Sequence, residues 1–209
     1  MVHANYKKKD IAGMTASEQL EKINERTREL VTLQYNTYNR SLVPLMHQHG
    51  IVVMDAFEDL SEAQAAFVDR YFEDNVYPVL TPMAVDASRP FPLIRNKTLN
   101  IAALLSKKKG KAEKEEIEFA TVQVPSVLPR LVHIPSEDGN EKTFILLEQV
   151  IERNIDKLFL NYDVLCAYPY RVMRNADLSI DEDEAADLLK EIQKQLKNAS
   201  VGRGDPSGS

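Results

Sequence analysis

The chain has 209 residues, of which 44% are hydrophobic and 28% are charged, and its formal net charge is −6. This balance is typical of a globular protein that buries a core without disulfides or metals, and the acidic charge disfavours a domain whose main ligand is a polyanion. Cys166 is the only cysteine, so no internal disulfide can form, and a reducing, cytoplasmic location is expected. No apolar run reaches the ~18 residues that span a bilayer, and no signal peptide is recognisable at the start.

A long amphipathic helix dominates the first quarter of the sequence. Residues 1–14 show no apolar periodicity and predict a solvated lead-in, whereas Thr15 and Glu18 have the spacing of a capping box. Pro44 is expected to kink or end the helix, and Gly50 to stop it. One face carries apolar or semi-apolar residues in steps of three and four: Leu20, Ile23, Thr27, Val31, Tyr35, Tyr38, Leu42 and Leu45. This face is longer than a small sheet can cover, so part of it is expected to contact a neighbouring domain or subunit.

The histidines and the cysteine are not spaced for catalysis or metal binding. His47 and His49 stand two residues apart on the predicted helix and so point to different faces, whereas ligand pairs use a spacing of three or four. His3 and His133 are isolated. Cys166 lies in an apolar, strand-like run and is predicted to be a buried, inert thiol. The sequence therefore predicts no catalytic, cofactor-binding or metal-ligating residue in this chain.

The stretch 76–97 is both proline-rich and apolar. It contains Pro78, Pro82, Pro90 and Pro92, whose missing N–H groups exclude a helix or a central strand. The apolar side chains between the prolines predict that the stretch is pinned against a core.

Shorter elements lie on both sides of this stretch. Residues 51–54 form an apolar run that predicts a strand, and Ser61 with Gln64 has the capping-box spacing of a helix start. Alternating side chains predict strands over 98–105 and 117–124, which we expect to pair as a hairpin.

Lysines are concentrated in the segment 106–116 between these two strands, namely Lys107, Lys108, Lys109, Lys111 and Lys114. One interpretation is a loop that contacts a polyanion electrostatically. We favour a solvated hairpin loop, because three nearby glutamates offset the charge and no aromatic side chain is interleaved for stacking on bases.

Strands and helices alternate in the C-terminal half. Residues 131–134 and 143–146 predict strands on either side of Asp138-Gly139, a dipeptide that favours a tight reversal. A helical stripe follows over 147–158. A further strand is predicted over 164–173, where Pro169 requires an edge position or a bulge.

The acidic run at Asp181 to Glu184 has two possible interpretations. It could hold magnesium, but it also precedes a helical stripe, and carboxylates in a first turn stabilise the free N–H groups of a helix. We favour the capping role. Residues 198–209 predict a disordered tail, in which Arg203-Gly204-Asp205 matches an integrin-binding triplet by chance.

Helices at both ends, with strands and proline-rich passages between them, predict an α+β fold. We expect a mixed or antiparallel sheet, a long N-terminal helix and a C-terminal helix.

Two passages of the sequence resemble one protein family. The first runs Pro-Val-Leu-Thr-Pro-Met-Ala-Val-Asp from Pro78 and continues as Pro-Phe-Pro-Leu-Ile-Arg-Asn-Lys-Thr-Leu-Asn from Pro90. The second runs Tyr-Arg-Val-Met-Arg-Asn-Ala-Asp-Leu from Tyr170 and includes the acidic run from Asp181. Both are similar to the middle, or head, region of bacterial polyphosphate kinases of the long class that is phosphorylated on histidine.

The resemblance implies a division of the chain and a parent reaction. Residues 1–14 would be a lead-in from an N-terminal domain, residues 15–197 the head domain, and residues 198–209 a disordered or non-native tail. The parent enzyme would transfer the terminal phosphate of ATP reversibly to polyphosphate through a phosphohistidine, with magnesium.

The same resemblance assigns the catalytic groups to other domains. The family's phosphohistidine and its phosphate ligands lie in C-terminal domains, so no catalytic residue is assigned here and no ATP or magnesium is expected in this piece. The expected partners are a second subunit, bound through the head domain, and the parent's N-terminal and catalytic domains. Polyphosphate would be reached only through the parent, and neither a membrane nor a nucleic acid is expected. The alternative is a free-standing protein-interaction module without nucleotide chemistry.

Overall fold

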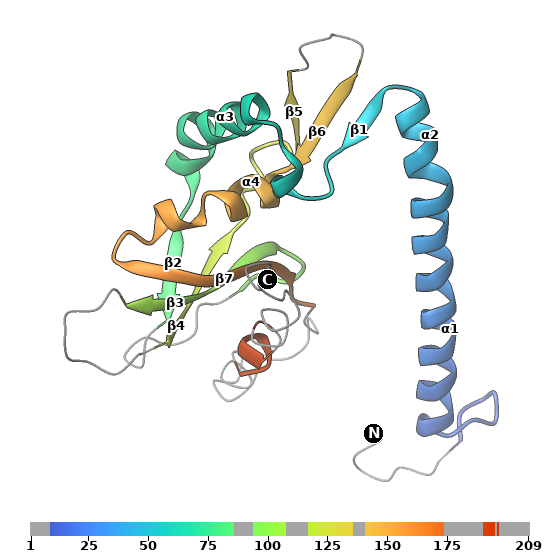
Figure 1. Cartoon of the computed structure of the whole chain (residues 1–209). Helices are drawn as coiled ribbons and strands as arrows, with labels where there is room; N and C mark the ends of the chain where they lie inside the picture. The colour runs from blue at the N-terminus through green and yellow to red at the C-terminus, as the bar shows by residue number, and fades with distance from the viewer. Residues whose placement is uncertain are drawn as a thin grey trace, which may run out of the picture. The chain divides into compact units, whose positions relative to one another are not determined.

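The computed structural model describes residues 9–85, 94–107, 117–135, 141–173, 190–194 and 196. The chain divides into two compact units, Met1–Val52 and Val53–Ser209 (Figure 1). The lysine-rich loop apart from Lys107, the Asp138-Gly139 turn, the acidic run at Asp181 and the predicted tail lie outside the described residues.

The first unit is built on helix α1, Ala16–Thr37. Its start is the predicted capping box: the Glu18 N–H donates to Thr15 Oγ1 at 3.4 Å, and the Thr15 N–H donates to Glu18 Oε2 at 2.7 Å. These two bonds satisfy N–H groups that the first turn of a helix leaves without a partner. The predicted helix start is therefore confirmed.

The chain stays helical through Pro44 instead of ending there. A π-helical turn, Tyr38–Leu42, follows α1, and helix α2 then runs over Val43–Gln48. The Val43 N–H donates to the Tyr38 carbonyl, five residues back, which is the wider spacing of a π turn. Because this turn directly precedes the proline, the missing Pro44 N–H is accommodated by a change of helix type. The helix stops at Gly50, whose φ of 67° favours glycine, as predicted.

The second unit begins with the short elements that lead to the proline-rich stretch. A 3-10 turn, Phe57–Asp59, precedes helix α3, Glu62–Tyr71, which starts with the predicted Ser61–Gln64 capping box. The helix continues as a π turn over Phe72–Val76 and a 3-10 turn over Tyr77–Val79.

Part of the proline-rich stretch is a strand at the edge of a sheet. Strand β2, Pro82–Val85, pairs antiparallel with only one neighbour, in the sheet order β2-β4-β3-β7. An edge position is compatible with Pro82 and with the predicted exclusion of a central strand. Residues 86–93 of this stretch lie outside the described part of the chain.

The other strands of this antiparallel sheet confirm the predicted hairpin. Strands β3, Leu99–Lys107, and β4, Ile117–Gln123, pair with Ala103 opposite Ala120. Strand β7, Tyr162–Arg171, pairs with the other side of β3 and forms the second edge, so Pro169 lies on an edge strand as predicted. The register shifts by one residue beside Leu104 and Leu105, which marks a β-bulge in β7.

The described residues form a second, three-stranded sheet, whereas the sequence pattern predicted a single sheet. Its order is β1-β6-β5, from Ile51–Val53, Lys142–Leu146 and Leu131–Ile134, and β5 pairs antiparallel with β6. Helix α4, Leu147–Arg153, and a 3-10 turn, Ile155–Leu158, follow β6 directly. The predicted α+β class is confirmed, with two sheets in place of one.

Both faces of the four-stranded sheet are covered by apolar side chains. On one face, Ile101, Ala103 and Leu105 pack with α3, α4 and the second sheet in the main core (Figure 1). On the other face, Ala102, Leu104 and Phe119 pack with Leu196 and Ile192. This double burial explains why β3 has a nearly continuous apolar sequence.

Candidate functional site: the exposed face of helix α1

Helix α1 carries apolar side chains that the described chain leaves exposed. None of its 22 residues is buried. We define the α1 stripe as Leu20, Ile23, Thr27, Val31, Tyr35, Tyr38, Leu42 and Leu45. Within it, the exposed fraction of the large apolar residues ranges from 42% at Tyr38 to 63% at Tyr35. A continuous apolar surface of this kind is typical of an interaction site.

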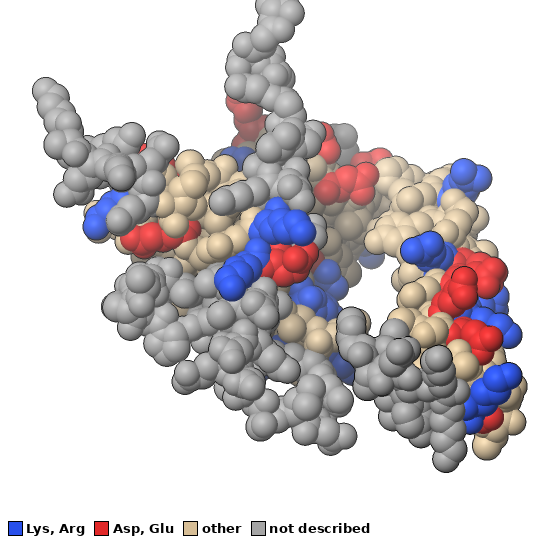
Figure 2. Space-filling model, turned by 90° about the horizontal axis from the view of Figure 1, so that it is seen from below, with Lys and Arg blue, Asp and Glu red and all other residues tan. Residues whose placement is uncertain are grey.

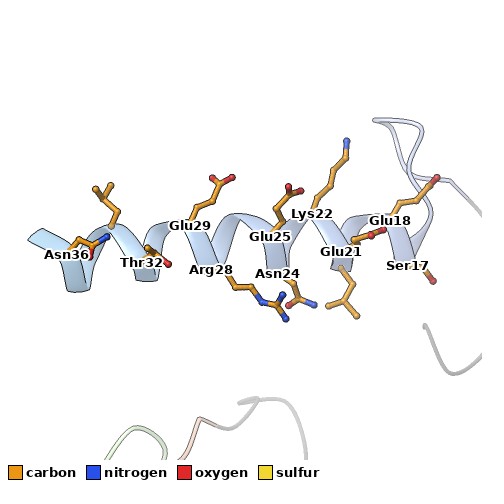
Figure 3. A pocket seen from close by; sticks show the side chains of 12 residues that line it. Ser17, Glu18, Glu21, Lys22, Asn24, Glu25, Arg28, Glu29, Thr32 and Asn36 are labelled. Atoms are coloured by element: carbon orange, nitrogen blue, oxygen red, sulfur yellow. The ribbon is translucent and has the colours of Figure 1, made fainter.

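Another face of α1, which adjoins the stripe at Leu20, is largely polar. A hollow along it is lined by twelve side chains that all come from α1; Leu20 and Leu33 are among them, and Figure 3 shows carboxylates, amides and an arginine beside them. Glu21, Glu25 and Glu29 follow one another at four-residue steps on this face. Basic and acidic side chains are interspersed over the helix surface (Figure 2). We interpret this face as the solvated side of an amphipathic helix.

Charge is unevenly distributed along α1. Every acidic or basic side chain of the helix lies between Glu18 and Glu29, and residues 30–39 contain none. Arg26 and Glu29 form an exposed ion pair at 2.6 Å within the charged part. The second half of the helix therefore presents only apolar and uncharged polar groups, including both tyrosines of the stripe.

The histidines singled out in the sequence have different surroundings. His47 and His49 are exposed at the end of α2, and the His133 ring contacts Phe144 on the neighbouring strand, with 5.3 Å between ring centroids. Among the residues that the structure describes, no group of three His, Cys, Asp or Glu side chains could hold a metal ion. His3 lies outside them.

Cys166 is partly buried, whereas the sequence predicted a buried thiol. Its location in β7, an edge strand, accounts for the difference, because only one side of the strand is paired. Burial raises the pKa of the thiol, which disfavours the thiolate that a nucleophile needs.

A second hollow, which the sequence analysis missed, lies on the face of the sheet opposite the main core. Its volume is about 550 Å³, and its lining includes Tyr168 and Tyr170 of β7, Ala102 of β3, and Ile192. The Tyr170 hydroxyl is hydrogen-bonded to Thr121 Oγ1 at 2.8 Å, and burial raises the pKa of Tyr170 to about 12. The two tyrosines face the same side of the sheet because they are two residues apart on a strand. This spacing is the sequence signal from which their shared face could have been predicted.

Ion pairs in the second unit connect helices and turns around the main core. Arg153 at the end of α4 binds Asp69 of α3, Lys157 binds Glu73, and Arg130 binds the buried carboxylate of Glu148. Each joins segments that are far apart in sequence, so we assign them to the fold and not to a reaction.

None of the helices that the structure describes has the length and apolar character needed to cross a membrane.

Comparison with protein families identifies both parts of the chain. The model of the polyphosphate kinase middle domain matches residues 63–204, which is more than half of the sequence. The chain belongs to the polyphosphate kinase family. The model of the polyphosphate kinase N-terminal domain matches residues 1–54, and this match ends close to the boundary between the two compact units.

Individual polyphosphate kinases show the same relationship. The chain is 49% identical over 203 residues to a polyphosphate kinase of Lactiplantibacillus plantarum, which covers 97% of this chain and 27% of that protein. It is 47% identical over 191 residues to a polyphosphate kinase of Halalkalibacterium halodurans, and this match covers 91% of this chain and 26% of that protein. The chain thus spans about a quarter of the length of these relatives, and the predicted resemblance to a middle, or head, fragment is confirmed.

A solved structure supports the fold. The crystal structure of polyphosphate kinase from Porphyromonas gingivalis superposes with a TM-score of 0.66 and 25% sequence identity. The match covers 90% of this chain and 30% of that one.

Proposed function

We propose that this chain is a non-catalytic part of a polyphosphate kinase that supports the assembly of the parent enzyme. The parent would transfer the terminal phosphate of ATP reversibly to polyphosphate through a phosphohistidine, with magnesium. Membership of the family is the observation that carries this proposal. The resemblance assigns the phosphohistidine to domains beyond the matched region, so the chain would contribute structure and not phosphate transfer.

We further propose that the chain self-associates through the α1 stripe. The support is physical: a helix with no buried residue exposes large apolar side chains, two of which are tyrosines. Tyrosine suits an interface because its ring is apolar and its hydroxyl remains able to bind water or a partner. The competing account is that the stripe is covered by other parts of the parent's N-terminal domain, whose family model matches α1.

A phosphotransfer assay tests the first proposal. The purified chain is incubated with γ-labelled ATP, magnesium and polyphosphate, and both protein-bound label and polyphosphate length are measured. The expected result is neither labelled protein nor chain growth, while a full-length polyphosphate kinase assayed in parallel gives both. Acid-labile label retained on His47, His49 or His133 would contradict the proposal.

Sedimentation tests the second proposal. The expected result is a reversible monomer–dimer equilibrium, weakened at least tenfold by Tyr35→Glu or Tyr38→Glu. Asn36→Glu is the matched control, because Asn36 lies on the polar face of the same helix (Figure 3) and should leave the equilibrium unchanged. A monomer at all concentrations, or open-ended aggregation that ignores the substitutions, would reject self-association through α1.

A further inference from the structure

One end of the four-stranded sheet is basic. Strand β3 begins there at Leu99, which lies opposite Arg171 of β7, and β4 ends there beside Asn100 of β3. Strand β2 starts at the same end, with Pro82 opposite Val122. Because the whole chain has a net charge of −6, a basic end is a local departure from the average. The described segments at this end contain three basic side chains and no acidic one: 79–83, 94–100, 121–129 and 167–173.

A tight turn joins two of these basic residues to the third. The Thr98 N–H donates to the Arg95 carbonyl at 3.3 Å, which closes a four-residue turn. The Lys97 N–H donates to the Val172 carbonyl at 2.8 Å, so the turn is fixed beside the residue that follows Arg171. All three basic side chains are exposed. We define the basic cluster as Arg95, Lys97 and Arg171.

Lys97 has a backbone conformation that lysine rarely adopts. Its φ is 62°, and in the described part of the chain the other two residues with a positive φ are Gly13 and Gly50. Glycine or asparagine usually occupies the third position of such a turn, because a bulkier side chain is strained there. A lysine at a strained position points to a use of its ammonium group beyond folding.

The three cations of the basic cluster are unpaired in the described structure. Elsewhere in the second unit, Arg130, Arg153 and Lys157 each bind a carboxylate. By contrast, no member of the cluster forms an ion pair within the part of the chain that the structure describes. Glu191 lines the second hollow together with Arg171, and its single charge leaves the cations in excess. Exposed cations that are close together attract an anion with several closely spaced charges.

We infer that the basic cluster binds polyphosphate and positions it in the parent enzyme. This inference rests on the proposed function and adds a binding surface to it. Polyphosphate carries a negative charge on every phosphate, so one chain can contact all three cations at once. The segment 94–100 holds no aromatic side chain for stacking on a base, which disfavours a nucleic acid.

Binding of the purified chain to long-chain, end-labelled polyphosphate tests the cluster, by fluorescence anisotropy over a range of salt concentrations. Lys97→Gln should raise the Kd about threefold or more and lower the salt dependence of log Kd by about one, because one phosphate contact is lost. Arg95→Gln and Arg171→Gln should act in the same way. Lys142→Gln is the matched control, because Lys142 is an exposed lysine at the start of β6 in the other sheet, and it should bind as the unmodified chain does.

Lys97→Gly separates the charge from the stability of the fold. Glycine adopts a positive φ without strain, so this variant should unfold at a higher urea concentration than the unmodified chain. It should nevertheless lose as much affinity for polyphosphate as Lys97→Gln does. Lys97→Arg keeps the charge and should bind normally. A loss of affinity in a more stable chain cannot come from unfolding.

Each outcome has a distinct meaning. Weaker, less salt-dependent binding by the cluster variants, with normal binding by Lys142→Gln, supports the inference. Unchanged affinity in the cluster variants, an equal loss in Lys142→Gln, or no binding of polyphosphate by the unmodified chain overturns it. Tighter binding of single-stranded DNA than of polyphosphate also overturns it, because the cluster would then serve a nucleic acid. None of these results rejects the proposed non-catalytic role, which fails if the purified chain transfers phosphate in the phosphotransfer assay.

Discussion

The guanidinium of Arg153 binds the carboxylate of Asp69 through two parallel hydrogen bonds, from Nε to Oδ1 at 2.8 Å and from Nη2 to Oδ2 at 3.0 Å. The pair connects the end of α4 with α3, which lie 84 residues apart in the sequence. Such a two-point contact fixes the relative orientation of the two helices better than a single bond. The hydrogen bonds from Arg153 hold the pKa of Asp69 below its usual value.

Asp69→Asn should therefore reduce the acid sensitivity of the fold. Because the folded-state pKa of Asp69 is depressed, its stabilising effect is present above the unfolded pKa of about 4 and is lost as pH falls through the lower folded pKa. At pH 7 the substitution should lower the free energy of unfolding by about 1 kcal/mol or less, because the pair is about one-third exposed. The free energy of unfolding, measured with urea, should differ less between pH 7 and pH 3 in the variant than in the parent chain. Asp74→Asn, an exposed carboxyl on the following turn, is the control, and an unchanged pH dependence for Asp69→Asn would contradict the assignment.

Arg130→Met should destabilise the fold more than Lys157→Met does. The Glu148 carboxylate that binds Arg130 is only 5% exposed, whereas the Glu73 carboxylate that binds Lys157 is 61% exposed. Removing Arg130 leaves a buried charge without its partner and should lower the free energy of unfolding by about 2 kcal/mol. Removing Lys157 should lower it by about 0.5 kcal/mol at most, because solvent screens that pair. Chemical denaturation measures both values, and equal losses would show that burial of Glu148 does not matter.

Tyr170 should make the fold sensitive to alkaline pH. Its folded pKa is raised to about 12 by burial, so its stabilising effect is complete below the unfolded pKa of about 10 and is lost as pH rises through 12. Tyr170→Phe should remove this dependence, and should also lower stability at pH 7 by about 1 kcal/mol, because the buried Thr121 hydroxyl loses its partner. Between pH 9 and pH 11.5 the free energy of unfolding should fall by up to about 2 kcal/mol more in the parent chain than in the variant. Tyr168→Phe serves as the control, and an equal pH dependence in Tyr170→Phe would refute the prediction.

Ala103→Leu should disturb the packing of α4 on the sheet. Ala103 is fully buried at the centre of β3, and its partners in both neighbouring strands, Ala120 and Ala167, are also alanines. Ala103 and Ala120 belong to the main core together with Val150 and Ile151 of α4, and α4 contacts both β3 and β7. Three added carbon atoms should lower the free energy of unfolding by about 1–3 kcal/mol through overpacking. Ala66→Leu, at an exposed position of α3, should change it little, and thermal unfolding would distinguish the two.

Local signals in the sequence predicted the element starts and the edge strands well. Thr15 with Glu18, and Ser61 with Gln64, form capping boxes at the predicted positions, because a cap depends only on residues three apart. Pro169 on an edge strand follows from a missing N–H group. The hairpin of β3 and β4 was equally accessible, since strand alternation and proximity in sequence favour it.

Features that depend on distant contacts were not predictable. Nothing near β7 in the sequence indicates that it pairs with β3, about sixty residues earlier, or that the strands divide into two sheets. The hollow beside Tyr168 forms because Ala102 lies opposite that residue on the neighbouring strand, which only the register determines. The effect of Pro44 was predicted incompletely for a different reason, because a local change of helix type can accommodate a proline.

The π-helical turn over Tyr38–Leu42 makes this helix tolerant of a change in length. A π turn contains about one residue more than an ordinary helical turn, so deleting Asn39 could restore a regular α-helix without breaking it. The deletion would then leave every later side chain at nearly the same angle around the helix axis relative to α1, because the π turn fits its extra residue into a single revolution. Leu42 and Leu45 would stay in the stripe, while the carbonyl opposite Pro44 would meet the proline ring. Loss of one residue at this position should therefore preserve the surface that the last two turns present, and its cost should arise at Pro44.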